Sequence, residues 1–127
     1  MIKPVYALVG DLIFATRIAK TAETMGLGAR TFDRAQRVMQ ASKEREPSLV
    51  IMDCERLEKE AFQLLAAMRT DASLAKIPCV GYLSHTAREL KQEMREAGCE
   101  QVYSRSEFTK ELEQILTRYS HGIPSRI

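Results

Sequence analysis

Residues 47–53 read Pro-Ser-Leu-Val-Ile-Met-Asp, and this stretch decides the fold class. Pro47 and Ser48 introduce four consecutive apolar residues, a pattern typical of a short strand that is buried on both faces. The run ends at Asp53, so the strand would carry a carboxylate at its C-terminal end. Open α/β sheets place their chemistry at such strand ends.

Four further buried or short strands are predicted, at residues 5–9, 29–32, 79–83 and 102–104. Each strand is followed by apolar residues three and four positions apart, which indicates an amphipathic helix. Asp33 and Thr86 are the expected N-caps of the second and fourth helices. The apolar stripes are Ile18, Ala22 and Met25; Ala35, Val38, Met39 and Ser42; Ala61, Phe62, Leu64, Leu65 and Met68; Leu90, Met94 and Ala97; and Phe108, Leu112, Ile115, Leu116 and Tyr119.

Five strands alternating with five helices predict a parallel sheet with helices on both faces. We expect one domain over residues 1–119, followed by a flexible tail over residues 120–127 that contains Gly122 and Pro124. The 127 residues are 45% hydrophobic and 28% charged, which is ordinary for a globular protein.

The charge balance and the cysteines limit the classes of function that the chain could have. Nineteen basic and 17 acidic residues leave a net charge of +2, which gives no electrostatic case for nucleic acid or a membrane surface. No signal peptide is seen, and no apolar stretch approaches the roughly 18 residues of a membrane span. Cys54, Cys79 and Cys99 form no C-x-x-C pair, so we expect reduced thiols in a cytoplasmic protein.

Polar residues follow four of the predicted strands. Asp11 follows the first, Asp53 the third, Ser84 the fourth and Arg105 the fifth. The carboxyl ends of parallel strands share one edge of the sheet, so we expect these side chains in one crevice. A carboxylate pair suits Mg²⁺, while a hydroxyl and a basic group suit the oxygens of a phosphoryl group.

This order and spacing resemble the receiver domain of bacterial two-component response regulators over residues 4–117. The most specific part is the apolar run into Asp53, then Phe62-x-Leu64-Leu65-x-x-Met68-Arg69, then Ile77-Pro78. The resemblance implies a flavodoxin-like, doubly wound five-stranded parallel sheet with strand order 2-1-3-4-5. It also implies that Asp53 is the phosphoacceptor and that Ser84 and Arg105 contact the phosphate. The metal would be Mg²⁺, bound weakly by Asp11, Asp53 and Glu55.

The chain departs from the receiver pattern at several positions. Gly10-Asp11 stands where the family has two acids, and Arg105-Ser106 stands where it has Lys-Pro. The switch aromatic of the family falls on Val102, with Tyr103 one residue later and therefore on the opposite face of the strand. Glu55 adds a carboxylate where the family uses a backbone carbonyl.

Two hypotheses follow. The chain is a switch phosphorylated on Asp53 by a histidine kinase or phosphotransfer protein, or a pseudo-receiver that binds partners without phosphorylation. Arg105 would contact phosphate in the first case, or pair permanently with Asp53, Asp11 or Glu55 in the second. Both are non-enzymatic, with no catalytic residue, and act by binding a downstream signalling protein. By resemblance, the output or homodimer face comprises the fourth helix, fifth strand and fifth helix, with Glu89, Gln92, Arg95, Tyr103 and Glu111.

Overall fold

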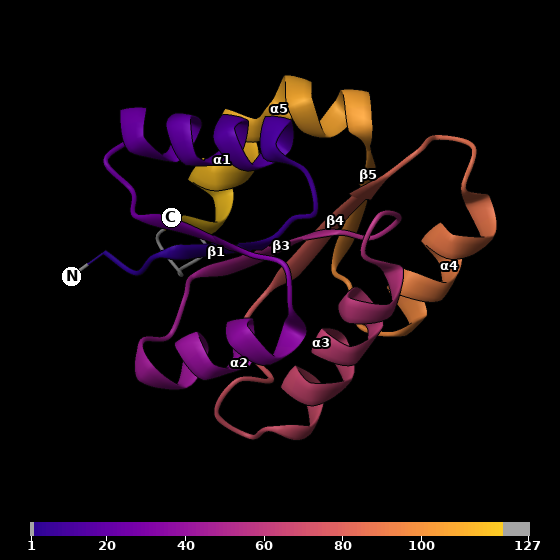
Figure 1. Ribbon diagram of the computed structural model, residues 1–127, viewed down its shortest axis with the longest axis horizontal. Helices are drawn as coiled ribbons and strands as arrows, with labels where there is room; N and C mark the ends of the chain where they lie inside the picture. The colour runs from indigo at the N-terminus through magenta and orange to yellow at the C-terminus, as the bar shows by residue number, and fades with distance from the viewer. Residues whose placement is uncertain (1, 121–127) are drawn as a thin grey trace.

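The computed structural model describes residues 2–120, which form a five-stranded parallel sheet with helices on both faces (Figure 1). The strand order is β2-β1-β3-β4-β5, so the predicted flavodoxin-like fold and its order are confirmed. The strands are β1 (Val5–Leu8), β2 (Ala29–Phe32), β3 (Leu49–Asp53), β4 (Cys79–Leu83) and β5 (Gln101–Ser104). The helices are α1 (Leu12–Thr24), α2 (Ala35–Glu44), α3 (Glu58–Thr70), α4 (Arg88–Glu96) and α5 (Arg105–Ser120).

The sheet separates two apolar cores. Helices α1 and α5 cover one face, and α2, α3 and α4 cover the other (Figure 1). Strand β3 lies in the middle and is buried along its whole length, with Leu49 and Ile51 on the α1/α5 side and Val50 and Met52 on the other. An uninterrupted apolar run can occupy this position because both of its faces are covered.

All three cysteines are buried free thiols. Burial raises the pKa of the Cys79 thiol to about 12, so this thiol stays protonated at ordinary pH and packs as a small hydrophobic side chain.

Both predicted helix caps are wrong. Helix α2 starts after Arg34, which makes no side-chain cap, and the Ala35 N–H donates to Glu60 Oε1 at 2.6 Å. The Glu60 carboxylate of α3 therefore caps the start of α2 in place of Asp33. Helix α4 starts after Ala87, while the Thr86 N–H donates to Ser84 Oγ at 3.3 Å.

We expect Glu60→Ala to lower the free energy of unfolding by about 1 kcal/mol, the usual cost of losing an N-cap. Glu58→Ala is the matched control, because Glu58 lies in the same first turn of α3 but is exposed. Urea denaturation of both variants measures the difference. Equal losses would mean that the Glu60–Ala35 hydrogen bond contributes nothing.

Helix α5 runs to Ser120, one residue beyond the expected end of the domain at residue 119. The rest of the predicted tail, residues 121–127, lies outside the described residues. Within residues 2–120, no helix has the length and apolar character needed to cross a membrane.

Candidate functional site

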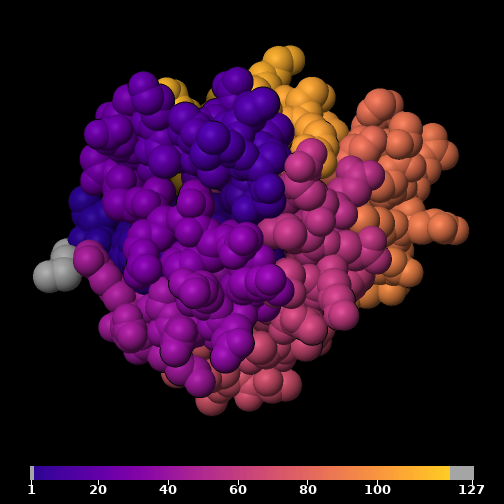
Figure 2. All heavy atoms as spheres, in the orientation of Figure 1, coloured from indigo at the N-terminus to yellow at the C-terminus, as the bar shows by residue number. Residues whose placement is uncertain are grey.

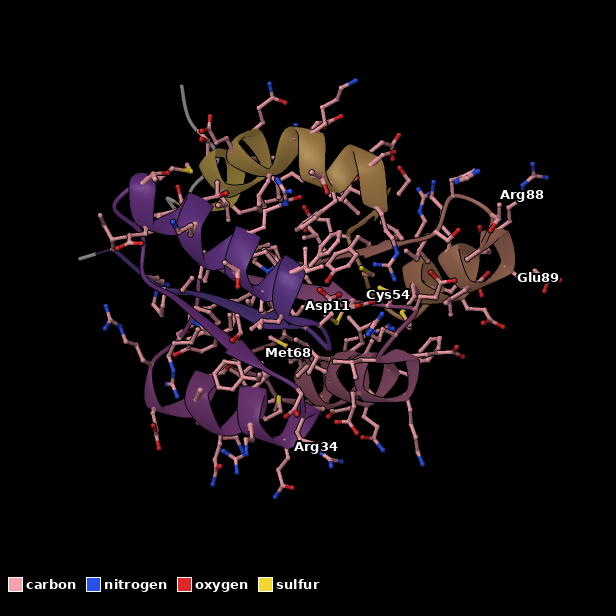
Figure 3. The ribbon with its side chains drawn as sticks, turned by 45° about the horizontal axis from the view of Figure 1, so that its top comes forward. Asp11, Arg34, Cys54, Met68, Arg88 and Glu89 are labelled. Carbon is pink, nitrogen blue, oxygen red and sulfur yellow. The ribbon has the colours of Figure 1, made fainter. Side chains whose placement is uncertain are left out.

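The carboxyl edge of the sheet brings the predicted site residues together. Leu8 of β1 is in register with Met52 of β3, and Asp53 is in register with Tyr82 of β4. The loops after β1, β3 and β4 therefore begin side by side. Figure 3 labels Asp11, at the start of α1, and Cys54, which directly follows Asp53.

Asp53 is a buried carboxylate that is only partly hydrogen-bonded. Its side chain is 0% exposed. The Oδ1 atom accepts the N–H of Arg56 at 2.9 Å and that of Glu55 at 3.3 Å, while Oδ2 has no hydrogen-bond partner. Burial raises the pKa of Asp53 above its usual value, although these N–H groups and the charge of Arg105 act in the opposite direction. Keeping Asp53 ionised therefore lowers the stability of the folded protein.

Arg105 supplies the positive charge beside Asp53. Its Nη2 atom lies 3.8 Å from Asp53 Oδ1 and 3.8 Å from Glu55 Oε1. The guanidinium carbon lies 5.6 Å from the centre of the Phe14 ring and 5.7 Å from that of Tyr82, within the range of cation–π attraction. Of the three carboxylates predicted as partners of Arg105, Asp53 and Glu55 lie at this distance, whereas Asp11 faces Arg56.

Arg105 does not pair with either carboxylate through two parallel hydrogen bonds. A single nitrogen faces both carboxylates, and neither distance is that of a direct hydrogen bond. The two aromatic rings hold the guanidinium between Asp53 and Glu55 rather than against either one. Arg105 is thus a shared cation for the pair.

Asp11 and Arg56 form a second pair in the site. Asp11 caps α1 by accepting the Phe14 N–H at 2.7 Å through Oδ1, and its Oδ2 lies 4.0 Å from Arg56 Nε. The aliphatic part of Arg56 covers Gly10, where an added Cβ would lie 3.0 Å from Arg56 Cδ. Arg56 was not among the site residues predicted from the sequence. Two features of the sequence could have indicated it: Gly10 stands where the receiver pattern has an acid, and Arg56 is a basic residue three positions after Asp53.

Ser84 and Glu55 are joined to each other. The Ser84 N–H donates to Glu55 Oε1 at 2.9 Å, so the backbone of Ser84, rather than its hydroxyl, contacts the site. The hydroxyl shares a 2.9 Å hydrogen bond with that of Thr86. Glu55 Oε1 therefore already has two partners, the Ser84 N–H and Arg105.

The arrangement does not fit a metal centre. Within residues 2–120, no three His, Cys, Asp or Glu side chains are grouped so that they could hold a metal ion. Each of the predicted ligands Asp11, Asp53 and Glu55 faces an arginine instead. Guanidinium groups occupy the neighbourhood in which a divalent cation would balance these carboxylates, so weak Mg²⁺ binding stays a prediction.

We expect the double variant Gly10→Asp/Arg56→Ala to bind Mg²⁺ at least about tenfold more tightly than the wild type, a gain of about 1.4 kcal/mol. It adds a carboxylate and removes the cation that covers residue 10. Calorimetry measures the affinity, and Gly10→Asn/Arg56→Ala controls for shape without the added charge. Tight binding by the wild type that is lost in Glu55→Gln would contradict the expectation.

The last strand separates its two central side chains as predicted. Val102 is buried in the core beneath α3 and α4, whereas Tyr103 packs on the opposite face with its ring centre 6.3 Å from that of Phe108. Tyr103 therefore does not replace an aromatic side chain at the position of Val102.

Comparison with solved structures identifies this architecture. No family model and no curated protein matches the sequence. The chemotaxis response regulator CheY4 of Vibrio cholerae superposes with a TM-score of 0.80 at 17% identity, covering 94% of this chain and 99% of that one. The Mn²⁺-bound form of the response regulator Rcp1 gives 0.78 at 12% identity, covering 98% and 99%.

A larger protein contains the same fold. NtrX from Brucella abortus matches with a TM-score of 0.78 at 17% identity over 95% of this chain. This chain spans only 27% of the NtrX chain. The sheet order and the layers of helices agree with these superpositions. The chain therefore has the fold of response-regulator receiver domains.

Proposed function

We propose that this chain is a receiver-type module of two-component signal transduction that acts by binding another protein without phosphorylation of Asp53. The partner would be a histidine kinase, a phosphotransfer protein or a downstream signalling protein. This is the pseudo-receiver hypothesis, in which a chain with the receiver fold has a signalling role that needs no phosphorylation.

One observation carries the proposal: the Asp53 side chain is 0% exposed and faces Arg105. A phosphoacceptor must reach the phosphorus of its donor with a free carboxylate oxygen. Of the two carboxylate oxygens of Asp53, only Oδ2 has no hydrogen bond, and this atom is buried. The cation that normally assists such a transfer has no group of ligands among residues 2–120.

A second candidate function is a switch phosphorylated on Asp53. The unpartnered Oδ2 supports it, because a buried polar atom without a hydrogen bond has an energetic cost that functional sites often retain. The Mn²⁺-bound form of Rcp1 supports it as well, since a chain of the same fold binds a divalent cation. In this case Arg105 and Ser84 would have to move to contact the phosphoryl group.

Incubation with acetyl phosphate and Mg²⁺, followed by mass spectrometry of the intact protein, separates the two functions. The proposal predicts no phosphoryl adduct on the wild type and no difference from Asp53→Asn. An adduct that forms on the wild type and is absent from Asp53→Asn would establish the switch. Arg105→Ala tests whether the pairing is what blocks transfer, since an adduct would then form only in that variant.

A further inference from the structure

An arginine-lined hollow lies at the C-terminal end of β2. Its volume is about 430 Å³, and its lining joins the end of β1, the end of β2 and the start of α2. Figure 2 shows the face of the molecule formed by α1, α2 and α3, in indigo to magenta. None of the residues proposed for the Asp53 site lines this hollow, so it is a separate feature. Its charged residues are Arg30, Asp33, Arg34 and Arg37.

The hollow concentrates the positive charge of the chain. Three arginines against one aspartate give it a net charge of +2, the same as that of all 127 residues. None of the ion pairs within residues 2–120 involves Arg30, Arg34 or Arg37. All three are exposed. Unpaired guanidinium groups around one cavity favour an anion with several oxygens, because each group can donate two parallel hydrogen bonds.

Part of this lining is preorganised. The guanidinium carbon of Arg30 lies 5.0 Å from the centre of the Phe32 ring and 6.0 Å from that of Tyr6. These rings hold the cation at the cavity wall, so less side-chain freedom is lost when a ligand binds. Arg34 lies in the turn between β2 and α2 (Figure 3).

Three of the first four N–H groups of α2 already have partners. The Ala35 N–H donates to Glu60 Oε1 at 2.6 Å, and those of Arg37 and Val38 donate to the Arg34 carbonyl oxygen. An anion would therefore be bound mainly by the arginine side chains. Asp33 lines the hollow and the Glu60 carboxylate lies nearby. Their repulsion would offset much of the attraction between the arginines and a singly charged anion. The net attraction selects for two or more negative charges.

We propose that this hollow binds a small phosphate-bearing molecule that carries at least two negative charges. The volume lies within the usual range of small-molecule sites, roughly 300–1,000 Å³. Val9 and Phe32 add an apolar floor that an extended acidic peptide would not need. The proposal does not depend on the role of Asp53.

Titration with sodium pyrophosphate at constant ionic strength tests the proposal, using calorimetry together with amide NMR of the ¹⁵N-labelled full chain. We expect saturable binding, with the amide signals of Val9, Phe32 and Ala35 shifting. Arg34→Gln and Arg37→Gln should each weaken binding at least about tenfold. Arg95→Gln is the matched control: it removes one exposed arginine of α4 and should leave the affinity unchanged.

Three results would overturn the proposal. The first is the absence of saturable shifts at these amides. The second is an equal loss of affinity in Arg37→Gln and Arg95→Gln, which would indicate only the overall charge. The third is tighter binding of a hexaglutamate peptide than of pyrophosphate, which would assign the surface to a polypeptide. Preserved spectral dispersion in each variant confirms that it is folded.

Discussion

Replacing Gly81 with alanine is expected to lower the free energy of unfolding by about 3 kcal/mol, at the upper end of the usual cost of overpacking. Gly81 lies in the middle of β4, where an added Cβ would overlap Cys54 Sγ and lie 3.4 Å from Cys99 Sγ. Strand β4 cannot move away, because β3 and β5 pair with it on both sides. Cys54 cannot move easily either, since it is 0% exposed.

Urea denaturation of Gly81→Ala measures this loss. Gly28→Ala is the control, because an added Cβ at Gly28 has no atom within 4 Å and its effect should stay within about 0.5 kcal/mol. Adding Cys54→Ala to Gly81→Ala removes the overlapping sulfur. The double variant should therefore be more stable than the sum of the single losses predicts, by about 1 kcal/mol or more. Strict additivity would contradict the assigned clash.

The second large effect is expected for Arg105→Ala, which should cost about 1–2 kcal/mol at pH 7.5. Removing one partner of a fully buried ion pair costs about 3–5 kcal/mol, and this pair is weaker because Arg105 is 35% exposed and 3.8 Å away. Without Arg105 the buried Asp53 carboxylate would lose its nearest cation. The stacking of Arg105 on Phe14 and Tyr82 would also be lost.

The effect of Arg105→Ala should depend on pH. The pKa of Asp53 is raised in the folded protein, so its ionised form lowers stability above that pKa. This cost is relieved as the pH falls through the folded pKa towards the usual value for Asp near 4. Arg105→Ala raises the folded pKa further. Its cost should therefore be largest near neutral pH and shrink towards pH 4.5.

Unfolding of four proteins between pH 4.5 and 8 measures this coupling: the wild type, Arg105→Ala, Asp53→Asn and the double variant. Asp53→Asn should be more stable than the wild type near neutral pH, because it removes the buried charge. In that background, Arg105→Ala should cost about 0.5–1 kcal/mol less than it does alone. The same cost in both backgrounds would show that Arg105 stabilises the fold through Glu55 and its aromatic contacts, and not through Asp53.

The fold was predictable because it depends on patterns that are local in sequence. The apolar run into Asp53 marks a strand buried on both faces, and the alternation of strands with amphipathic helices requires a parallel sheet. The convergence of Asp11, Asp53, Ser84 and Arg105 follows from parallel strand ends meeting at one edge. None of these inferences requires knowledge of side-chain conformations.

The details of the site were not predictable, because they depend on neighbours that are distant in sequence or on a choice between several donors. The cap of α2 comes from Glu60 instead of Asp33, and Glu60 lies 25 positions along the chain from Ala35, whose N–H it accepts. The Ser84 hydroxyl shares a hydrogen bond with the hydroxyl of Thr86, only two residues away along the chain. The Ser84 N–H instead donates to Glu55. Arg56 covers Gly10 only because the loops after β1 and β3 run side by side.

In the proposed function, Arg105 and burial keep Asp53 out of phosphoryl chemistry. Beryllofluoride mimics a phosphoryl group on a carboxylate, so amide NMR of the ¹⁵N-labelled wild type with Mg²⁺ and beryllofluoride tests this proposal. We expect the amide signals of Glu55, Arg56 and Ser84 to stay unchanged, as they do in Asp53→Asn. Saturable shifts of these three signals in the wild type, absent from Asp53→Asn, would contradict it.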